Sequence, residues 1–246
     1  MNAAFGTALD DWLYFGGYPG AIALADDEMA WKQYVRDSLV ETVLARDVLQ
    51  MQAIAKPALL RHLFMLAAAY PAQILSYNKM LGQLVDAGNT TTLSHYVRLL
   101  EGAYLLSGLE LFRIGERPKR GSSPKLILWN NALVTALSAY SRAGCREHPE
   151  FWGRLVENAV GAVLLSAFQG LTHEVYYWRR GDGEVDFIIH SPARTWAVEV
   201  KSSRTRNTNG LRAFLDLHPK ARPFIVGASG MPLEEFFRTR PQEIFT

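Results

Sequence analysis

Cysteine is nearly absent from this sequence of 246 residues, and so are other features that mark particular protein classes. The single cysteine, Cys145, excludes an internal disulfide and a zinc cage built of cysteines. No basic start followed by an apolar run comes after Met1, so a reducing cytoplasm is the expected location. The longest apolar stretches, Leu63–Ala69 and Ala159–Ala167, are shorter than the roughly 20 residues of a membrane-spanning helix, so no membrane partner is expected.

Neither sign of charge dominates, because the sequence has 26 Lys and Arg residues and 24 Asp and Glu residues, which gives a net charge of +2. That balance excludes a bulk polycation that coats DNA, so any nucleic-acid surface must be a local patch. The phosphate-binding patterns G-x-x-x-x-G-K-[ST] and G-x-G-x-x-G are also missing, so ATP hydrolysis by this chain is not expected. What remains is a globular composition, 49% hydrophobic, that can bury one or two cores.

The first half reads as helices followed by a hairpin. Apolar residues at helical spacing, with proline and glycine at the ends, predict helices over Asp26–Gln50, Ala58–Tyr70, Tyr77–Ala87 and from Thr90 or Thr91 to Tyr104. Strand-like runs at Leu109–Ile114 and Lys125–Trp129 then flank a polar loop. Two helices followed by a hairpin are typical of a winged helix-turn-helix, so residues 1–140 are expected to form a helical unit of that kind.

The second half changes to strand alternation after a boundary at Ser141–Pro149, where small and turn-favouring residues interrupt the pattern. The expected elements are a helix, three strands, a helix and a strand: Phe151–Phe168, Glu174–Arg179, Glu184–His190, Thr195–Ser202, Asn209–Leu217 and Pro223–Val226. The predicted fold class is therefore α+β, with the helical unit first and a mixed sheet of αβββαβ order over residues 150–246.

Charged residues interrupt two of these apolar strands. Asp186 lies in the second strand, and Glu199 and Lys201 lie in the third, where alternation puts them on one face. Burying a carboxylate costs several kcal/mol, by order of magnitude, unless a cation compensates it. If the strands are neighbours, Asp186 and Glu199 form a hard-oxygen site suited to Mg²⁺, and Lys201 can orient a water.

Asp186 followed by Glu199-Val200-Lys201, within this element order, resembles the PD-(D/E)xK nuclease superfamily, whose fold is restriction-endonuclease-like. The resemblance implies that Asp186 and Glu199 hold the metal and that Lys201 assists the attacking water. It also implies a catalytic role for Glu157 on the preceding helix. The residues alone leave a second interpretation open for Asp186, Glu199 and Lys201, which is a salt-bridged trio retained without catalysis.

A wider resemblance covers almost the whole chain. It is carried by the segments Tyr14–Gly20, Arg46–Asp47, Thr92–Leu106, Gly153–Asn158, Glu184–Phe187 and Val198–Lys201. Together they are similar to prokaryotic AAA-type ATPases that carry a C-terminal domain of unknown function. The resemblance implies that this chain corresponds to the C-terminal portion of that family, without the N-terminal P-loop domain, and that an AAA-type ATPase domain is its partner.

Basic residues suggest where nucleic acid, most simply DNA, would bind. Arg117, Lys119, Arg120 and Lys125, opposed only by Glu116, predict a basic wing. The preceding helix would turn Thr91, Ser94, His95 and Arg98 toward a groove, while the wing contacts the phosphate backbone. Arg179 and Arg180, just before the Asp186 strand, could hold a further phosphate.

Two functions follow from these observations. The first is a DNA-binding module with a Mg²⁺-dependent phosphodiesterase site, normally part of an AAA-type ATPase. The alternative is a non-catalytic platform of nuclease-like fold, used for binding or oligomerisation, which serves the attached ATPase. Carboxylates that open onto a groove would favour the nuclease, and carboxylates sealed under side chains would favour the platform.

Overall fold

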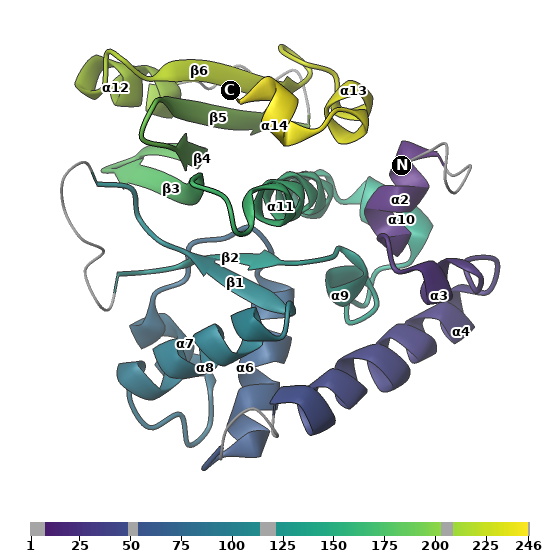
Figure 1. The fold of residues 1–246 in the computed structure, drawn as a ribbon. Coiled ribbons are helices and arrows are strands. Elements are labelled where there is room, and N and C mark those ends of the chain that lie inside the picture. The colour runs from purple at the N-terminus through teal and green to yellow at the C-terminus, as the bar shows by residue number, and fades with distance from the viewer. Residues whose placement is uncertain (1–7, 49–53, 114–121, 203–208, 246) are drawn as a thin grey trace.

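The structure is a computed structural model that describes residues 8–48, 54–113, 122–202 and 209–245 (Figure 1). It confirms the α+β class, because helices surround one two-stranded and one four-stranded sheet. The first half begins with α2 (Leu9–Phe15), α3 (Pro19–Ile22), α4 (Glu28–Gln33), η1 (Tyr34–Val40) and η2 (Val43–Val48). It continues with α6 (Pro57–Ala69), α7 (Tyr77–Gln83), α8 (Thr90–Gly102), β1 (Leu106–Leu109), β2 (Lys125–Leu128), α9 (Ala132–Thr135) and α10 (Arg142–Glu147).

Side-chain caps explain where several of these helices begin. Asp27 accepts hydrogen bonds from two backbone N–H groups at the start of α4, and Ser76 and Asn89 each accept one at the starts of α7 and α8. As far as Val48, the long helix expected over Asp26–Gln50 is present as α4 followed by two π-helical stretches, η1 and η2; residues 49–50 lie outside the described part of the chain. The two helices that precede α4, namely α2 and α3, were not predicted from the sequence.

The small sheet pairs β1 with β2 in antiparallel register, from Leu106 opposite Leu128 to Leu109 opposite Lys125. The strand expected over Leu109–Ile114 was placed too late in the chain. Leu111 and Phe112 leave the hairpin and instead join β3, since Leu111 bridges Tyr177 and the N–H of Phe112 donates to the Tyr177 carbonyl. The apolar run that suggested one strand is therefore shared between two sheets.

The second half contains α11 (Pro149–Phe168), β3 (Glu174–Arg180), β4 (Gly183–His190), β5 (Thr195–Lys201), α12 (Asn209–Leu217) and β6 (Arg222–Gly227). The sheet order is β3-β4-β5-β6; β4 is antiparallel to both β3 and β5, and β6 is parallel to β5. This is the expected helix, three strands, helix, strand. Two short helices, α13 (Leu233–Arg238) and α14 (Pro241–Ile244), follow it and were not predicted.

A β-bulge in β4 changes which face its residues present. Tyr176 pairs with Ile188 and Trp178 pairs with Val185, so Asp186 and Phe187 together oppose Tyr177 alone. Such an extra residue bends the strand and re-aims the side chains beside it. Val185 packs in the cluster with Phe214 of α12, whereas Phe187 packs with Val156 and Val160 of α11. The bulge therefore lets Asp186 and Phe187 both face α11, which simple alternation would not allow.

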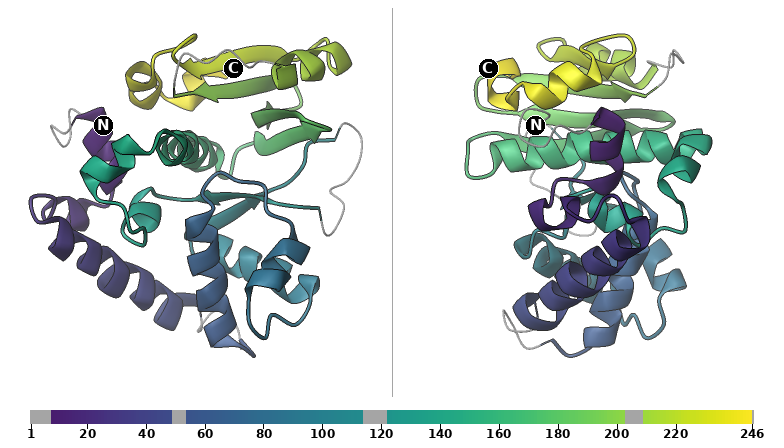
Figure 2. Two further views of the ribbon diagram at one scale, coloured as in Figure 1. Left: turned by 180° about the vertical axis from the view of Figure 1, so that it is seen from behind. Right: turned by 90° about the vertical axis from the view of Figure 1, so that its right-hand side faces the viewer.

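Helix α11 lies between the two sheets, with the four-stranded sheet on one side and β1–β2 on the other (Figures 1 and 2). One apolar cluster joins Leu13 and Ile127 of the first half to Val156 and Phe187 of the second. Close approach depends on Gly161, where a Cβ atom would lie 2.9 Å from the Phe187 ring and 3.0 Å from Ile127. The two halves therefore share a core.

The expected boundary at 141–149 contains the helix α10, whose Arg142 and Arg146 form ion pairs with Asp11 and Asp10 of α2. In the same region Tyr14 and Phe15 of α2 are buried against Trp31 of α4, so these aromatic side chains pack within the chain. No helix in the described part of the chain is long and apolar enough to cross a membrane.

Candidate carboxylate centre

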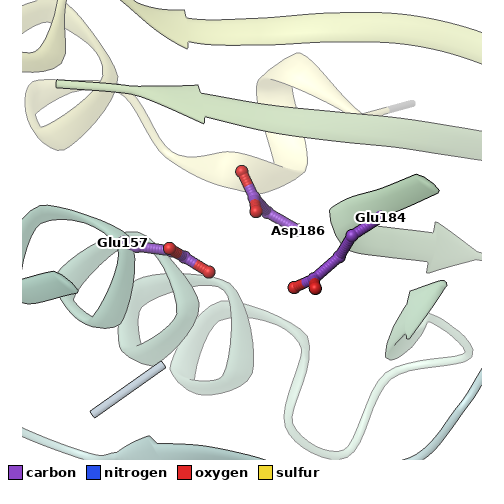
Figure 3. A group of neighbouring side chains, drawn as sticks. All are labelled: Glu157, Glu184 and Asp186. Atoms are coloured by element: carbon purple, nitrogen blue, oxygen red, sulfur yellow. The ribbon is translucent and has the colours of Figure 1, made fainter. Parts of the chain in front are cut away.

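A lysine, Lys125 of β2, occupies the middle of the candidate site. Its side chain is fully buried, and its Nζ lies 2.5 Å from Glu157 Oε1, 3.2 Å from Glu184 Oε1 and 3.5 Å from Asp186 Oδ1. It also donates a hydrogen bond to the Asp186 carbonyl oxygen at 3.2 Å. The three carboxylates come from α11 and β4 and lie close together, each with an oxygen within 4.8 Å of the others (Figure 3).

Each partner reaches Lys125 for a local reason. Glu157 lies one helical turn before Gly161, so the face of α11 that approaches β2 and β4 most closely also carries this carboxylate. Glu184 and Asp186 are two residues apart on β4 and share a face. The Phe187 ring centroid lies 5.2 Å from the Lys125 ammonium, which is within range of a cation–π interaction.

Two members of the predicted trio, Glu199 and Lys201, form a second ion pair beside the first group. Asp186 and Glu199 lie on the neighbouring strands β4 and β5, and Lys201 Nζ lies 2.5 Å from Glu199 Oε1. Asp186 Oδ2 accepts a hydrogen bond from the Val200 N–H at 2.7 Å, which ties its carboxylate to β5. The other oxygen of Glu199, Oε2, is buried without a hydrogen-bond partner among the described residues.

Burial and like charge govern protonation in this group. Burial and, after it, the nearby Asp186 carboxylate raise the pKa of Glu157 to about 7 against the opposing effect of Lys125. Burial and Asp186 likewise raise the pKa of Glu199 to about 7 against the opposing effect of Lys201. Burial alone would lower the pKa of Lys125, but its carboxylate partners, Glu157 first, raise it above the ordinary value. Lys125 therefore remains an ammonium at neutral pH.

These shifts predict how stability depends on pH. Glu157 and Glu199 hold protons more tightly in the folded chain than in the unfolded chain, so stability should fall as pH rises from about 4.5 to about 7 and level off above it. One differential proton corresponds to a slope of about 1.4 kcal/mol per pH unit. Urea unfolding at several pH values, with a chelator present, would measure the slope. Glu199→Gln should flatten it, and an equal slope in that variant would contradict the assignment.

The structure corrects the interpretation of Lys125, which the sequence assigned to a basic wing. Its ammonium is instead enclosed by three carboxylates, because β2 packs beside α11. Of the residues proposed for catalysis or metal binding, Glu157 and Asp186 meet at Lys125, while Glu199 and Lys201 contact each other. Glu184 was missed, although its two-residue spacing from Asp186 within a strand was a usable signal.

The predicted nucleic-acid residues are not gathered on one described basic surface. Arg98 on α8 is exposed and, with Thr91 and Ser94, lines a hollow of about 640 Å³ whose other charged residues are Glu101, Glu110 and Glu174. Arg179 and Arg180 are exposed at the end of β3. Arg117, Lys119 and Arg120 lie outside the described residues. Among the described residues, the hollow beside Arg98 is therefore lined by more acidic than basic side chains.

Two buried asparagines hold β2 and α11 in place beside the centre. Asn158, the residue after Glu157, accepts a hydrogen bond from the Leu128 N–H and donates to the Leu128 carbonyl and to Asn131 Oδ1, each at 2.9 Å. Asn131 in turn donates to the Leu13 and Leu155 carbonyls. Sequence reasoning did not assign these two residues a role.

Comparison with known proteins finds two families. A family model described as a domain of unknown function (DUF8612) matches residues 6–143, and another described as a domain of unknown function (DUF4143) matches residues 152–237. Uncharacterized proteins of Mycobacterium bovis and Mycobacterium tuberculosis are each 27% identical to this chain over 202 residues, covering 79% of the chain and 43% of the relative. The chain thus spans less than half the length of these curated relatives. No solved structure matches.

Proposed function

The chain belongs to the family described as a domain of unknown function (DUF8612), and we propose that it is a binding module whose nuclease-like centre is held closed. The observation that carries this proposal is the fully buried Lys125 ammonium among Glu157, Glu184 and Asp186. The second half, in this proposal, keeps the residue pattern of a PD-(D/E)xK nuclease but acts as a platform.

Metal chemistry explains why a closed centre should not cut nucleic acid. Mg²⁺ requires oxygen ligands at about 2.0–2.1 Å in octahedral geometry. Two of the carboxylates it would need, Glu157 and Asp186, already face an ammonium within 3.5 Å. A divalent ion placed among them would be repelled by that charge at short range. The position between these carboxylates is already taken by a cation, the Lys125 ammonium.

The partner that we propose for the platform is the remainder of a longer protein. The matched relatives extend well beyond the aligned region, and the sequence resembles the C-terminal portion of AAA-type ATPases. The acidic surroundings of Arg98 argue against a DNA backbone on that face of α8, because Glu101, Glu110 and Glu174 would repel phosphates. A winged-helix contact with DNA would therefore depend on Arg117, Lys119 and Arg120.

A Mg²⁺-dependent nuclease is the second candidate. It is favoured by the placement of Asp186 and Glu199 on neighbouring strands, with Lys201 beside Glu199 and an unpartnered Glu199 oxygen. In that function Asp186 and Glu199 would hold the metal, and Lys201 would orient a water molecule.

Metal titration and a cleavage assay separate the two candidates. Calorimetry with Mg²⁺ or Mn²⁺ should detect no stoichiometric binding by the unmodified chain, because the Lys125 ammonium already occupies the position between the carboxylates. Incubation with supercoiled, linear and single-stranded DNA, and with RNA, should give no cleavage above that of Glu199→Gln. Metal binding together with cleavage that Glu199→Gln abolishes would reject the closed module and establish the nuclease.

A further inference from the structure

Lys125 lies where a metal ion would be expected from its neighbours. Oxygens of Glu157, Glu184 and Asp186 approach one another within 4.8 Å, and the ammonium contacts all three. Carboxylates held this closely in a partly buried site are stabilised by a positive charge between them. In this chain the positive charge is supplied by a side chain from another sheet.

The centre holds more negative charge than Lys125 can balance. Lys125 faces three carboxylates; Arg154, 3.6 Å from Glu157 Oε2, partly compensates one of them. Next to Asp186, the Glu199 side chain is 8% exposed, and its Oε2 is buried without a hydrogen-bond partner among the described residues. An acceptor oxygen of this kind is available to a cation that carries more charge than an ammonium.

We infer that Lys125 is the resident cation of this centre, and that Lys125 and a divalent metal ion occupy it in mutual exclusion. The inference rests on the proposed function, because it states how the closed centre is kept closed. Shortening the side chain removes the ammonium and leaves space among oxygens that Mg²⁺ and Mn²⁺ favour. The centre then becomes a divalent-metal site.

The same contact joins the two halves of the chain. Lys125 belongs to β2, where its backbone also pairs with Leu109 and bridges Ile74, while its carboxylate partners belong to α11 and β4. Withdrawing the ammonium from the centre would therefore require β2 to move relative to α11. A rearrangement between the halves would open the metal site, and metal binding would stabilise the rearranged state.

Two substitutions at the same position test the inference. Lys125→Ala removes the charge and leaves room for an ion, whereas Lys125→Met removes the charge but keeps most of the volume. Thermal unfolding of the full chain would be measured in chelator and then with Mn²⁺ or Mg²⁺ alone. We expect Lys125→Ala to unfold at a lower temperature than the parent and to gain about 5 °C or more at roughly 100 times its Kd for Mn²⁺.

The parent chain and Lys125→Met should show no metal-dependent shift, and adding Asp186→Asn to Lys125→Ala should remove the gain. If Lys125→Ala is unfolded in chelator, recovery of its circular dichroism by Mn²⁺ replaces the temperature shift as the measurement. Lys125→Ala without a response to metal in either assay would overturn the inference and leave the closed module standing. A metal-dependent shift of equal size in the parent chain would overturn both the inference about Lys125 and the proposed closed module.

Discussion

Replacing Lys125 by methionine should destabilise the chain by about 3–5 kcal/mol, the loss typical of removing one partner from a buried ion pair. The methionine fills most of the space but leaves Glu157, Glu184 and Asp186 without the ammonium that lies within 3.5 Å of each. Urea unfolding monitored by tryptophan fluorescence would measure the loss.

A double-mutant cycle with Glu157→Gln identifies the source of that loss. If repulsion between unpaired carboxylates causes it, neutralising Glu157 in the Lys125→Met background should restore about 1–2 kcal/mol, a coupling within the usual range for contacting residues. Additive effects of the two substitutions would show instead that Lys125 contributes through packing alone. Arg61→Met is a suitable control, since the side chains of Arg61 and its partner Glu41 are both exposed and the pair should be worth about 1 kcal/mol or less.

Replacing Asn158 by aspartate should cost about 4 kcal/mol, although the two side chains have nearly the same shape. The amide nitrogen of Asn158 donates to the Leu128 carbonyl and to Asn131 Oδ1, so an aspartate would place an oxygen against two acceptors. It would also bury a charge without a cation beside it. Urea unfolding again provides the measurement.

The neighbouring Asn130 supplies a matched control for this substitution. Its Oδ1 accepts hydrogen bonds from the N–H groups of Gly17 and Ala132, and an aspartate oxygen would accept both. Asn130→Asp should therefore change stability by only about 0.5 kcal/mol, as expected for a substitution that preserves its contacts. A loss as small for Asn158→Asp as for Asn130→Asp would mean that the asparagine pair is not needed to hold α11 against β2.

The sequence was sufficient to predict the helices and strands from α11 to β6, because the patterns that indicate them, strand alternation and turn residues, are local. Alternation marks β4 and β5, and short turns connect β3, β4 and β5 into neighbouring antiparallel strands, so Asp186 could be placed near Glu199 from spacing alone. The shared face of Glu199 and Lys201 follows from the same period of two, and their 2.5 Å contact confirms it. The β-bulge at Asp186 and Phe187 left no comparable signal, because it depends on how β3 pairs with β4.

By itself the sequence determined the α+β class, the order of the sheet-forming elements in the second half, and the neighbouring positions of Asp186 and Glu199. Only the tertiary structure decided the role of Lys125. In the sequence this lysine follows a basic loop and has the pattern of a solvated residue, whereas its partner Asp186 is 61 residues away along the chain. A buried ammonium needs compensating negative charge, and in this chain the carboxylates that supply it come from α11 and β4. That arrangement depends on packing between distant segments, which local periodicity does not encode.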